Sequence, residues 1–266
     1  MKSSKESKIE QKILALLFGK AKEICEYIFK DKEIHYLQEY ANTVSIKRLG
    51  YNDHGPVHMR QAALNAIRIF ILLHDAGIKF SLEKEEVGTT EDSLSGVIIA
   101  ALLHDLGMSV SRDKHEFSSL LLSLPIIDRI LKKFYPKNLE KQTILRSLIS
   151  EGILGHMGTI KINSLEAGLI LLGDGCDMQK GRARIPILIG NHPQRGDIHK
   201  YSADSILKVT ISKGEEKPVK IDILMESTVG FFQIEEVLIP KINSSPLKSY
   251  IELDGTVKNS ETKRYF

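Results

Sequence analysis

Apolar residues recur every three or four positions through most of the first 190 residues, which is the period of an amphipathic helix. Residues 8–38 show this period with Lys and Glu between the apolar positions, so we expect one or two helices there. The same pattern predicts helices over about 55–75, 116–134 and 139–154. Residues 165–174 form a more apolar run, for which we also predict a helix.

Residues 96–107 form an almost continuous aliphatic run that ends in a His-Asp pair at positions 104 and 105. The run predicts a fully buried segment, but its length alone does not separate a helix from a strand. Burying a His-Asp pair is costly unless something binds it, and a divalent metal would meet that cost. The simpler interpretation is a helix end that is closed by Gly107 in the left-handed conformation.

The pattern changes after residue 197, where apolar and polar residues alternate over 207–212 and 219–225. This alternation predicts two strands, and the Gly-Glu-Glu-Lys at 214–217 predicts the turn of a hairpin between them. A helix is expected over 232–242 and a further strand over 249–257.

This order of elements predicts a mainly α protein with two parts. The first would be a helical metal-binding domain of residues 1–196, and the second a small C-terminal α+β module of residues 197–266. The chain has no Walker loop and no Gly-x-Gly-x-x-Gly, which argues against P-loop and dinucleotide binding.

Composition says little about the binding partners and the cellular compartment of the protein. The formal charge of +3 on 266 residues is too small to argue for nucleic acid or membrane binding, although nucleic acid and a homo-oligomer stay open. Cys25 and Cys176 alone give no disulfide framework, which suggests a reducing compartment. The polar first residues lack the apolar core of a signal peptide, and no apolar run approaches the roughly 20 residues of a membrane span. We expect a cytoplasmic protein.

A second His-Asp pair, His74-Asp75, competes with the pair at 104 and 105. His54 and His58 are four residues apart at the start of the predicted 55–75 helix, so they can lie near one another. The zincin pattern uses this spacing but needs Glu where this chain has Gly55. In an unbroken helix His74 would lie about 24 Å from His58, too far to share a metal with it. We therefore favour His104-Asp105.

Further His, Asp and basic residues stand at the ends of the other predicted helices. His115 precedes the 116–134 helix, His156 follows the 139–154 helix, and Asp174 ends the 165–174 helix. Each is unremarkable alone. Asp177 follows at i+3 on nearly the same face as Asp174, where a carboxylate is either paired or a ligand. Three basic residues then alternate in a predicted loop, which suits an anion site or a solvated loop equally: Lys180, Arg182 and Arg184.

Together these residues resemble the pattern of the HD-domain metal-dependent phosphohydrolase superfamily, which is a His, then a His-Asp pair, then a distant Asp on a helical bundle. The resemblance covers about residues 45–190. It implies a first metal held by His58, His104, Asp105 and Asp174. As in two-metal members, it also implies a second metal held by His115 and His156, with Asp105 bridging. Mixed His and Asp ligation allows Mn, Fe, Co, Zn or Mg, with one or two ions per chain.

The segment from Tyr51 to His58 also resembles the Tyr-His-Asn-x-x-His segment of cyclic-nucleotide phosphodiesterases, in which the earlier His donates a proton and the later one binds metal. This likeness implies that His54 is the general acid. The Lys that follows His-Asp-x-Gly in cyclic-di-nucleotide phosphodiesterases is Met108 here, which weighs against that substrate.

The function implied by the resemblance is a metal-dependent phosphohydrolase or phosphodiesterase, a phosphoric ester hydrolase acting on a small-molecule phosphate ester. The expected substrate is a nucleotide, attacked by a metal-activated water, with Asp105 and His54 as catalytic residues. Lys180, Arg182, Arg184 and Asp177 would bind the substrate. One alternative is a nucleotide- or RNA-sensing binding module with a structural metal, and another is an interaction scaffold. The complete ligand set together with His54 favours the enzyme.

Overall fold

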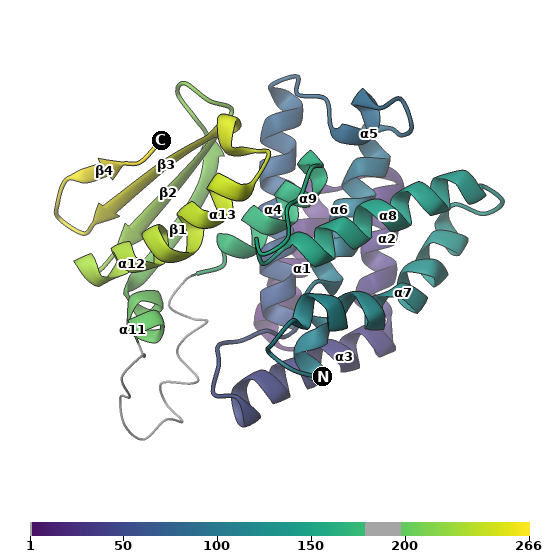
Figure 1. Ribbon diagram of the computed structural model, residues 1–266, viewed down its shortest axis with the longest axis horizontal. Coiled ribbons are helices and arrows are strands. Elements are labelled where there is room, and N and C mark those ends of the chain that lie inside the picture. The colour runs from purple at the N-terminus through teal and green to yellow at the C-terminus, as the bar shows by residue number, and fades with distance from the viewer. Residues whose placement is uncertain (1, 179–197) are drawn as a thin grey trace.

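Residues 2–178 fold as a bundle of helices in a computed structural model, which describes these residues and residues 198–266 (Figure 1). Its helices are α1 (Ser4–Leu16), α2 (Gly19–Lys30), α3 (Lys32–Thr43), α4 (Pro56–Asp75), α5 (Ser81–Lys84), α6 (Thr90–Leu103), α7 (His115–Phe134), α8 (Leu139–Gly155) and α9 (Leu165–Gly175). Every residue of α6 from Asp92 to Leu103 is buried. A helix that is covered all round lies in the middle of a bundle, so the aliphatic run before His104 is a helix rather than a strand.

The N-terminal segment contains more helices than its apolar period predicts. In place of one or two helices over residues 8–38, the chain forms α1, α2 and α3. Gly19 begins α2 with a positive φ of 57°, and Asp31 caps α3 by accepting a hydrogen bond from the backbone N–H of Ile34. The apolar positions keep their spacing across both breaks because all three helices turn an apolar face to the same core.

A buried polar network ties the start of α4 to the end of α6. Arg60 is 2% exposed, and its guanidinium donates to Glu10 at 2.8 Å, to Gln38 at 2.8 Å and to the backbone oxygen of Pro56 at 3.1 Å. Gln38 in turn donates to the backbone oxygen of Leu102 at 2.7 Å. A buried guanidinium is tolerated only when it is paired in this way. The network fixes the two helix ends that carry His58 and His104.

Residues 198–266, here the C-terminal part, form a sheet with helices beside it. In chain order the elements are α11 (Ile198–Ser205), β1 (Ile206–Lys213), β2 (Val219–Met225), α12 (Phe231–Gln233), α13 (Ile239–Ser244), β3 (Ile251–Val257) and β4 (Thr262–Arg264). The strand order is β1-β2-β3-β4. β1 and β2 form an antiparallel hairpin, β2 and β3 are parallel, and β4 pairs antiparallel to β3.

The predicted strands, the hairpin and the mainly α fold class are confirmed. The predicted helix over 232–242 is helical throughout, with a π-turn at Ile234–Leu238 joining α12 to α13. We did not predict β4, which is short and exposed on every residue, so it carries no alternation of apolar and polar positions. The proposed boundary at 196/197 falls at the edge of the stretch outside the described residues, and the division into two domains stays a prediction.

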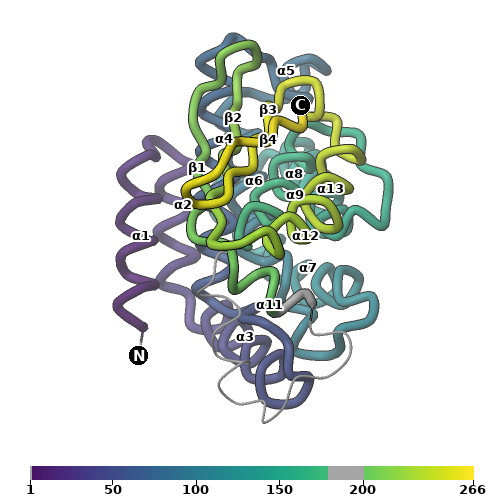
Figure 2. The backbone as a smooth tube through the Cα atoms, turned by 90° about the vertical axis from the view of Figure 1, so that its left-hand side faces the viewer, coloured from purple at the N-terminus to yellow at the C-terminus, as the bar shows by residue number. Residues whose placement is uncertain are grey.

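The C-terminal part packs directly on the helical bundle. Figure 2 shows the strands in front of the bundle, where β1 and β2 contact α4. On the other side α13 lies against α9 (Figure 1). A side chain at Gly168 of α9 would come within 3.0 Å of Leu247, and one at Gly175 within 3.1 Å of Lys241. Small residues on α9 therefore allow the C-terminal part to approach closely, and the buried apolar residues of both parts form one contiguous core.

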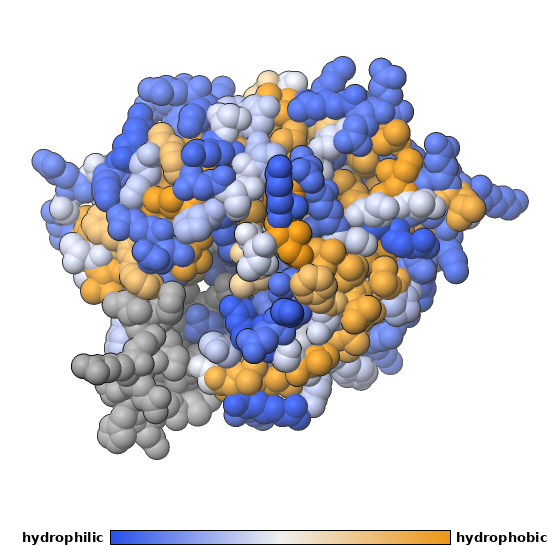
Figure 3. Space-filling model, viewed as in Figure 1, coloured by the Kyte–Doolittle hydropathy of each residue, from blue (hydrophilic) through white to orange (hydrophobic). Residues whose placement is uncertain are grey.

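The surface carries both polar and apolar side chains. In the space-filling view, apolar side chains gather over the part of the bundle that α7 occupies, where Phe117 and Leu121 are 46% and 70% exposed (Figure 3). None of the described helices combines the length and the apolar character needed to cross a membrane.

Gly107 brings α7 up to the His-Asp pair, and it does so through close packing rather than as a left-handed helix stop. Gly77 does have a positive φ of 76° after α4, but Gly107 has none and lies in a 3₁₀ turn, Leu106–Ser109. A Cβ at Gly107 would lie 2.1 Å from the backbone oxygen of His115 and 2.4 Å from the backbone nitrogen of Ser119. The interpretation of Gly107 as a left-handed stop is therefore wrong.

We predict that Gly107→Ala destabilises the protein by about 3 kcal/mol, because the added methyl group meets backbone atoms that cannot rotate away. Gly96→Ala is the matched control, since its Cβ meets only the end of the Leu148 side chain and alanine favours a helix. Urea denaturation of both variants measures the difference. Equal denaturation midpoints for the two variants would show that the Leu106–Ser109 turn shifts to make room for the methyl group.

Candidate metal centre

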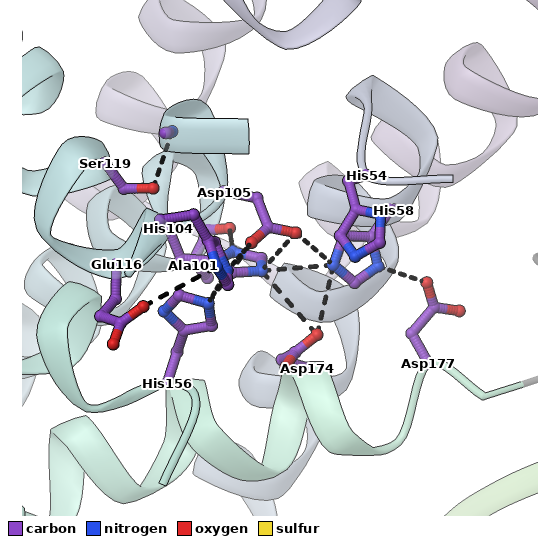
Figure 4. Close-up of polar contacts among 12 residues, drawn as sticks. His54, His58, Ala101, His104, Asp105, Glu116, Ser119, His156, Asp174 and Asp177 are labelled. Carbon is purple, nitrogen blue, oxygen red and sulfur yellow. Dashed lines mark hydrogen bonds and ion pairs between the residues drawn. The ribbon is translucent and has the colours of Figure 1, made fainter. Parts of the chain in front are cut away.

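Among the described residues, the ends of α4, α6, α7, α8 and α9 meet at one place in the bundle, and each brings a His or Asp side chain to it (Figure 4). His58 lies on the first turn of α4, His115 begins α7, and Asp174 lies on the last turn of α9. His104 and His156 directly follow α6 and α8. The helices thus end where their polar residues converge.

Four side-chain atoms make up what we call the first donor set: His58 Nε2, His104 Nε2, Asp105 Oδ2 and Asp174 Oδ1. His58 Nε2 lies 3.2 Å from His104 Nε2, 3.1 Å from the Asp105 oxygen and 3.2 Å from the Asp174 oxygen. His104 Nε2 lies 3.4 Å from the Asp105 oxygen and 3.8 Å from the Asp174 oxygen. All four side chains are at least 90% buried.

The second donor set consists of Asp105 Oδ1, His115 Nε2 and His156 Nε2. The two imidazole nitrogens are 3.0 Å apart, and they lie 3.1 and 3.3 Å from the Asp105 oxygen. The two oxygens of Asp105 therefore face different donor sets. This is the arrangement that a carboxylate bridging two ions requires. Three residues of the first set, His58, His104 and Asp105, and all three of the second could hold a metal ion.

The hydrogen bonds behind the four imidazoles fix which nitrogen carries the proton. Nδ1 of His104 lies 2.9 Å from the backbone oxygen of Ala101, and Nδ1 of His156 lies 2.7 Å from that of Ile153. Nδ1 of His115 lies 3.0 Å from the backbone oxygen of Arg112. A carbonyl oxygen only accepts, so each of these Nδ1 atoms carries a hydrogen and donates it.

His58 follows the same rule through a carboxylate. Its Nδ1 donates to Asp177 Oδ2 at 2.7 Å. In their neutral form all four imidazoles therefore present Nε2 lone pairs to the carboxylate oxygens and to one another at 3.0–3.8 Å. Acceptors this close and this buried repel unless a proton or a metal cation lies between them, so the chemistry of the donor sets fits a metal.

The spacing of the donor atoms fits as well. Ligand bonds of about 2.1 Å separate neighbouring ligand atoms by about 3.0 Å in an octahedron and about 3.4 Å in a tetrahedron. The separations given above lie near these values, apart from 3.8 Å between His104 and Asp174.

The electrostatics of the site favour the metal-binding forms of Asp105, Asp174 and His156. Burial raises the pKa of Asp105, but the positive charge of a protonated His104 and hydrogen bonds from His104, His115 and His156 outweigh it and hold that pKa well below the usual range. Asp174 is also held well below its usual pKa, by Lys241 and then His58, against the effect of burial. Burial lowers the pKa of His156 to about 4. Both carboxylates are therefore ionised and His156 is neutral at neutral pH.

His54 lies beside the first donor set without belonging to it. Its ring is edge-on to that of His58, with centroids 5.7 Å apart. Nδ1 of His54 lies 2.7 Å from the backbone oxygen of Asn52 and 2.9 Å from Ser45 Oγ, so it donates toward them. The His54 side chain lines a cleft over the donor sets.

The competing pair is remote from this centre. His74 and Asp75 lie at the far end of α4, and their side chains are 57% and 69% exposed. Because α4 is unbroken from Pro56 to Asp75, His74 cannot turn back to His58. The geometry supports the choice of His104-Asp105.

Some of the residues expected to bind substrate have a different position or lie outside the described chain. Asp177 holds the outer nitrogen of His58, which places its carboxylate behind a donor rather than in front of it (Figure 4). Lys180, Arg182 and Arg184 lie outside the described residues, so their role stays a prediction.

Lys241 of α13 is a residue of the centre that the sequence did not reveal. Its ammonium donates to Asp174 Oδ2 and, at 2.9 Å, to the backbone oxygen of His156, so it contacts one residue of each donor set. The only hint in the sequence is its position between Leu238 and Ile242, on the face that the predicted helix would bury. A lone lysine on an apolar face does not reveal its partner.

The cleft over the donor sets has a volume of about 690 Å³. Asp105 and Asp174 line it from the helical bundle, Tyr51 comes from the loop before α4, and Glu236 and Lys241 come from the C-terminal part. Both parts of the chain therefore line one cleft.

The chain is similar in sequence to a known archaeal protein. The chain is 39% identical over 245 residues to the uncharacterized protein MJ1020 of Methanocaldococcus jannaschii, and the match covers 92% of each chain. No protein-family model matches the chain. No solved structure is significantly similar to it.

We predict that the reconstituted protein holds close to two divalent ions per chain and that His115→Ala holds close to one, because only the second donor set loses a ligand. His74→Ala is the matched control and should keep the parent value. Elemental analysis after Mn²⁺ reconstitution and gel filtration gives the stoichiometry. One ion per chain in both the parent and His115→Ala would remove the second site.

Proposed function

Since the chain belongs to the same family as the archaeal protein MJ1020, whose name states no activity, we propose its function from the site. We propose that it is a metal-dependent phosphoric ester hydrolase of the HD-domain superfamily, with a nucleotide as substrate. The helical bundle and the His/Asp cluster are compatible with this family.

One observation carries the proposal: Asp105 offers one oxygen to each of two buried donor sets. Divalent ions held there would lower the pKa of a coordinated water and neutralise charge on a phosphoryl group, which is what the hydrolysis of phosphate esters needs. A structural site is usually closed by four protein ligands. Here the second donor set has three ligands and opens into a cleft, which favours catalysis.

Hydrogen-bond acceptors behind the donor atoms orient the imidazole rings. Asp177 fixes the ring of His58 from behind, and the backbone oxygens of Ala101 and Ile153 fix the rings of His104 and His156. Such outer contacts set the tautomer of a ligand and increase its basicity. None of these outer contacts uses an Asp105 oxygen, so both oxygens face the donor sets.

His54 is the proposed general acid. Its Nδ1–H is held by Asn52 and Ser45, so a proton that it donates or accepts must move at Nε2. Nε2 would give its proton to the departing oxygen of the ester.

The size of the cleft supports a nucleotide as substrate, and its lining argues against a cyclic di-nucleotide. A volume of about 690 Å³ lies in the usual range of small-molecule sites. Met108 stands where the cyclic-di-nucleotide phosphodiesterases carry Lys, and it is fully buried, so this position presents nothing to the cleft.

The proposal predicts that the Mn²⁺-loaded protein hydrolyses at least one member of a panel of nucleoside monophosphates, deoxynucleoside triphosphates and cyclic nucleotides. Asp105→Ala should lose both metal and turnover, because both donor sets lose an oxygen, and His74→Ala should keep both. Chromatography of the products measures turnover. Tight nucleotide binding without turnover in the metal-loaded parent would instead support a nucleotide-sensing module.

A second prediction isolates His54. General acid catalysis is worth roughly 10²–10⁴-fold and matters most when the leaving oxygen is basic. His54→Asn should therefore slow the hydrolysis of a ribosyl ester about 100-fold or more. A nitrophenyl ester, whose leaving group departs without a proton, should be affected far less, and metal content should match the parent. An equal loss on both esters, or a loss of metal, would contradict this role.

A further inference from the structure

Two cationic side chains, Lys241 and Arg112, line the described walls of the cleft, one beside each donor set. Lys241 contacts Asp174 of the first set, and Arg112 lies 3.4 Å from His115 Nδ1 of the second. They come from parts of the chain that are far apart in sequence, α13 and the loop before α7. Neither is needed to complete a donor set.

The charge of Lys241 is unexpected at a site for cations. Its side chain is only 10% exposed, and a full positive charge beside a metal site repels the metal. Its ion pair with Asp174 balances part of this charge, and it also donates to the His156 carbonyl. An ammonium has three hydrogens, and these two acceptors use two of them. Among the described residues no group accepts the third hydrogen, which leaves it available to an anion in the cleft.

Arg112 has the complementary features. Its guanidinium lies over the ring of Tyr51, 5.6 Å from the centroid. Within residues 2–178 and 198–266, no carboxylate forms a salt bridge with it. His115 Nδ1 already donates its hydrogen to the Arg112 backbone oxygen, so that nitrogen does not accept from the guanidinium. An arginine stacked on an aromatic ring keeps its donor edge available for the oxygens of a phosphate.

We infer that Lys241 and Arg112 form an anion clamp that holds a terminal phosphoryl group over the donor sets. This inference rests on the proposed function and narrows its substrate class to phosphomonoesters. A monoester presents three non-bridging oxygens and up to two negative charges, whereas a diester presents two oxygens and one charge. Two donor sets and two cations match the monoester. The clamp also makes the C-terminal part a component of the substrate site, because Lys241 comes from it.

The clamp is tested by anion binding, without turnover. Isothermal titration of the Mn²⁺-loaded full chain with inorganic phosphate should show binding, and dimethyl phosphate, a monoanionic diester, should bind at least tenfold more weakly. Lys241→Met and Arg112→Met should each weaken phosphate binding at least tenfold while metal content stays at the parent value. Lys241→Arg and Arg112→Lys, which keep the charge, should lose less.

Two matched controls separate the clamp from a general effect of charge. Lys258→Met removes an exposed lysine from the C-terminal part, and Arg48→Met removes an arginine that also lies 5.6 Å from a tyrosine centroid but does not line the cleft. Both should bind phosphate like the parent.

Two results would overturn the clamp. Loss of metal in Lys241→Met, with normal phosphate binding in Arg112→Met, would show that Lys241 only holds Asp174. Unchanged phosphate affinity in both variants, with metal retained, would show that neither residue binds phosphate. A failure of the proposed hydrolase is a separate result: the parent would then bind phosphate through the clamp but turn over no ester.

Discussion

The centre of this protein depends on one electrostatic constraint: in the neutral form of its imidazoles, buried lone pairs face each other with no hydrogen between them. Within each donor set, imidazole Nε2 atoms lie 3.0–3.8 Å from one another and from oxygens of Asp105 or Asp174. Lys241 reaches only the outer oxygen of Asp174. The acceptors would move apart without support, and hydrogen bonds to the outer nitrogens of the imidazoles hold them in place.

Helix ends supply that support. The last carbonyls of a helix lack partners within the helix. His104 and His156 each follow a helix and donate Nδ1–H to the carbonyl three residues back, which satisfies that carbonyl and fixes the tautomer of the donor at once. The carbonyl of Arg112 does the same for His115 at the start of α7. A histidine just after an apolar helix is thus oriented by the helix itself.

This local logic explains how much of the site the sequence could reveal. His104 and Asp105 stand out because an aliphatic run ends in charge, and the length of α4 alone separates His74 from His58. Contacts between residues far apart in the chain leave no comparable pattern in the sequence. Lys241 meets Asp174 across 67 residues, and nothing in the spacing of α13 indicates this partner. The same holds for the fold, where helix periodicity predicted the bundle but not the breaks between α1, α2 and α3.

The site also bears on the stability of the fold. Its ligands come from the ends of α4, α6, α7, α8 and α9, so a bound cation would connect helices that are far apart in sequence. The unfolded chain cannot offer these ligands together, and a ligand that binds only the native state stabilises it by its binding free energy. Without a cation, the mutual repulsion of the acceptors opposes the packing of the same helix ends. Lys241 relieves part of this repulsion at Asp174, and it reaches that carboxylate only while α13 is packed on α9. The packing of the C-terminal part and the charge balance of the centre are therefore coupled through this one ammonium.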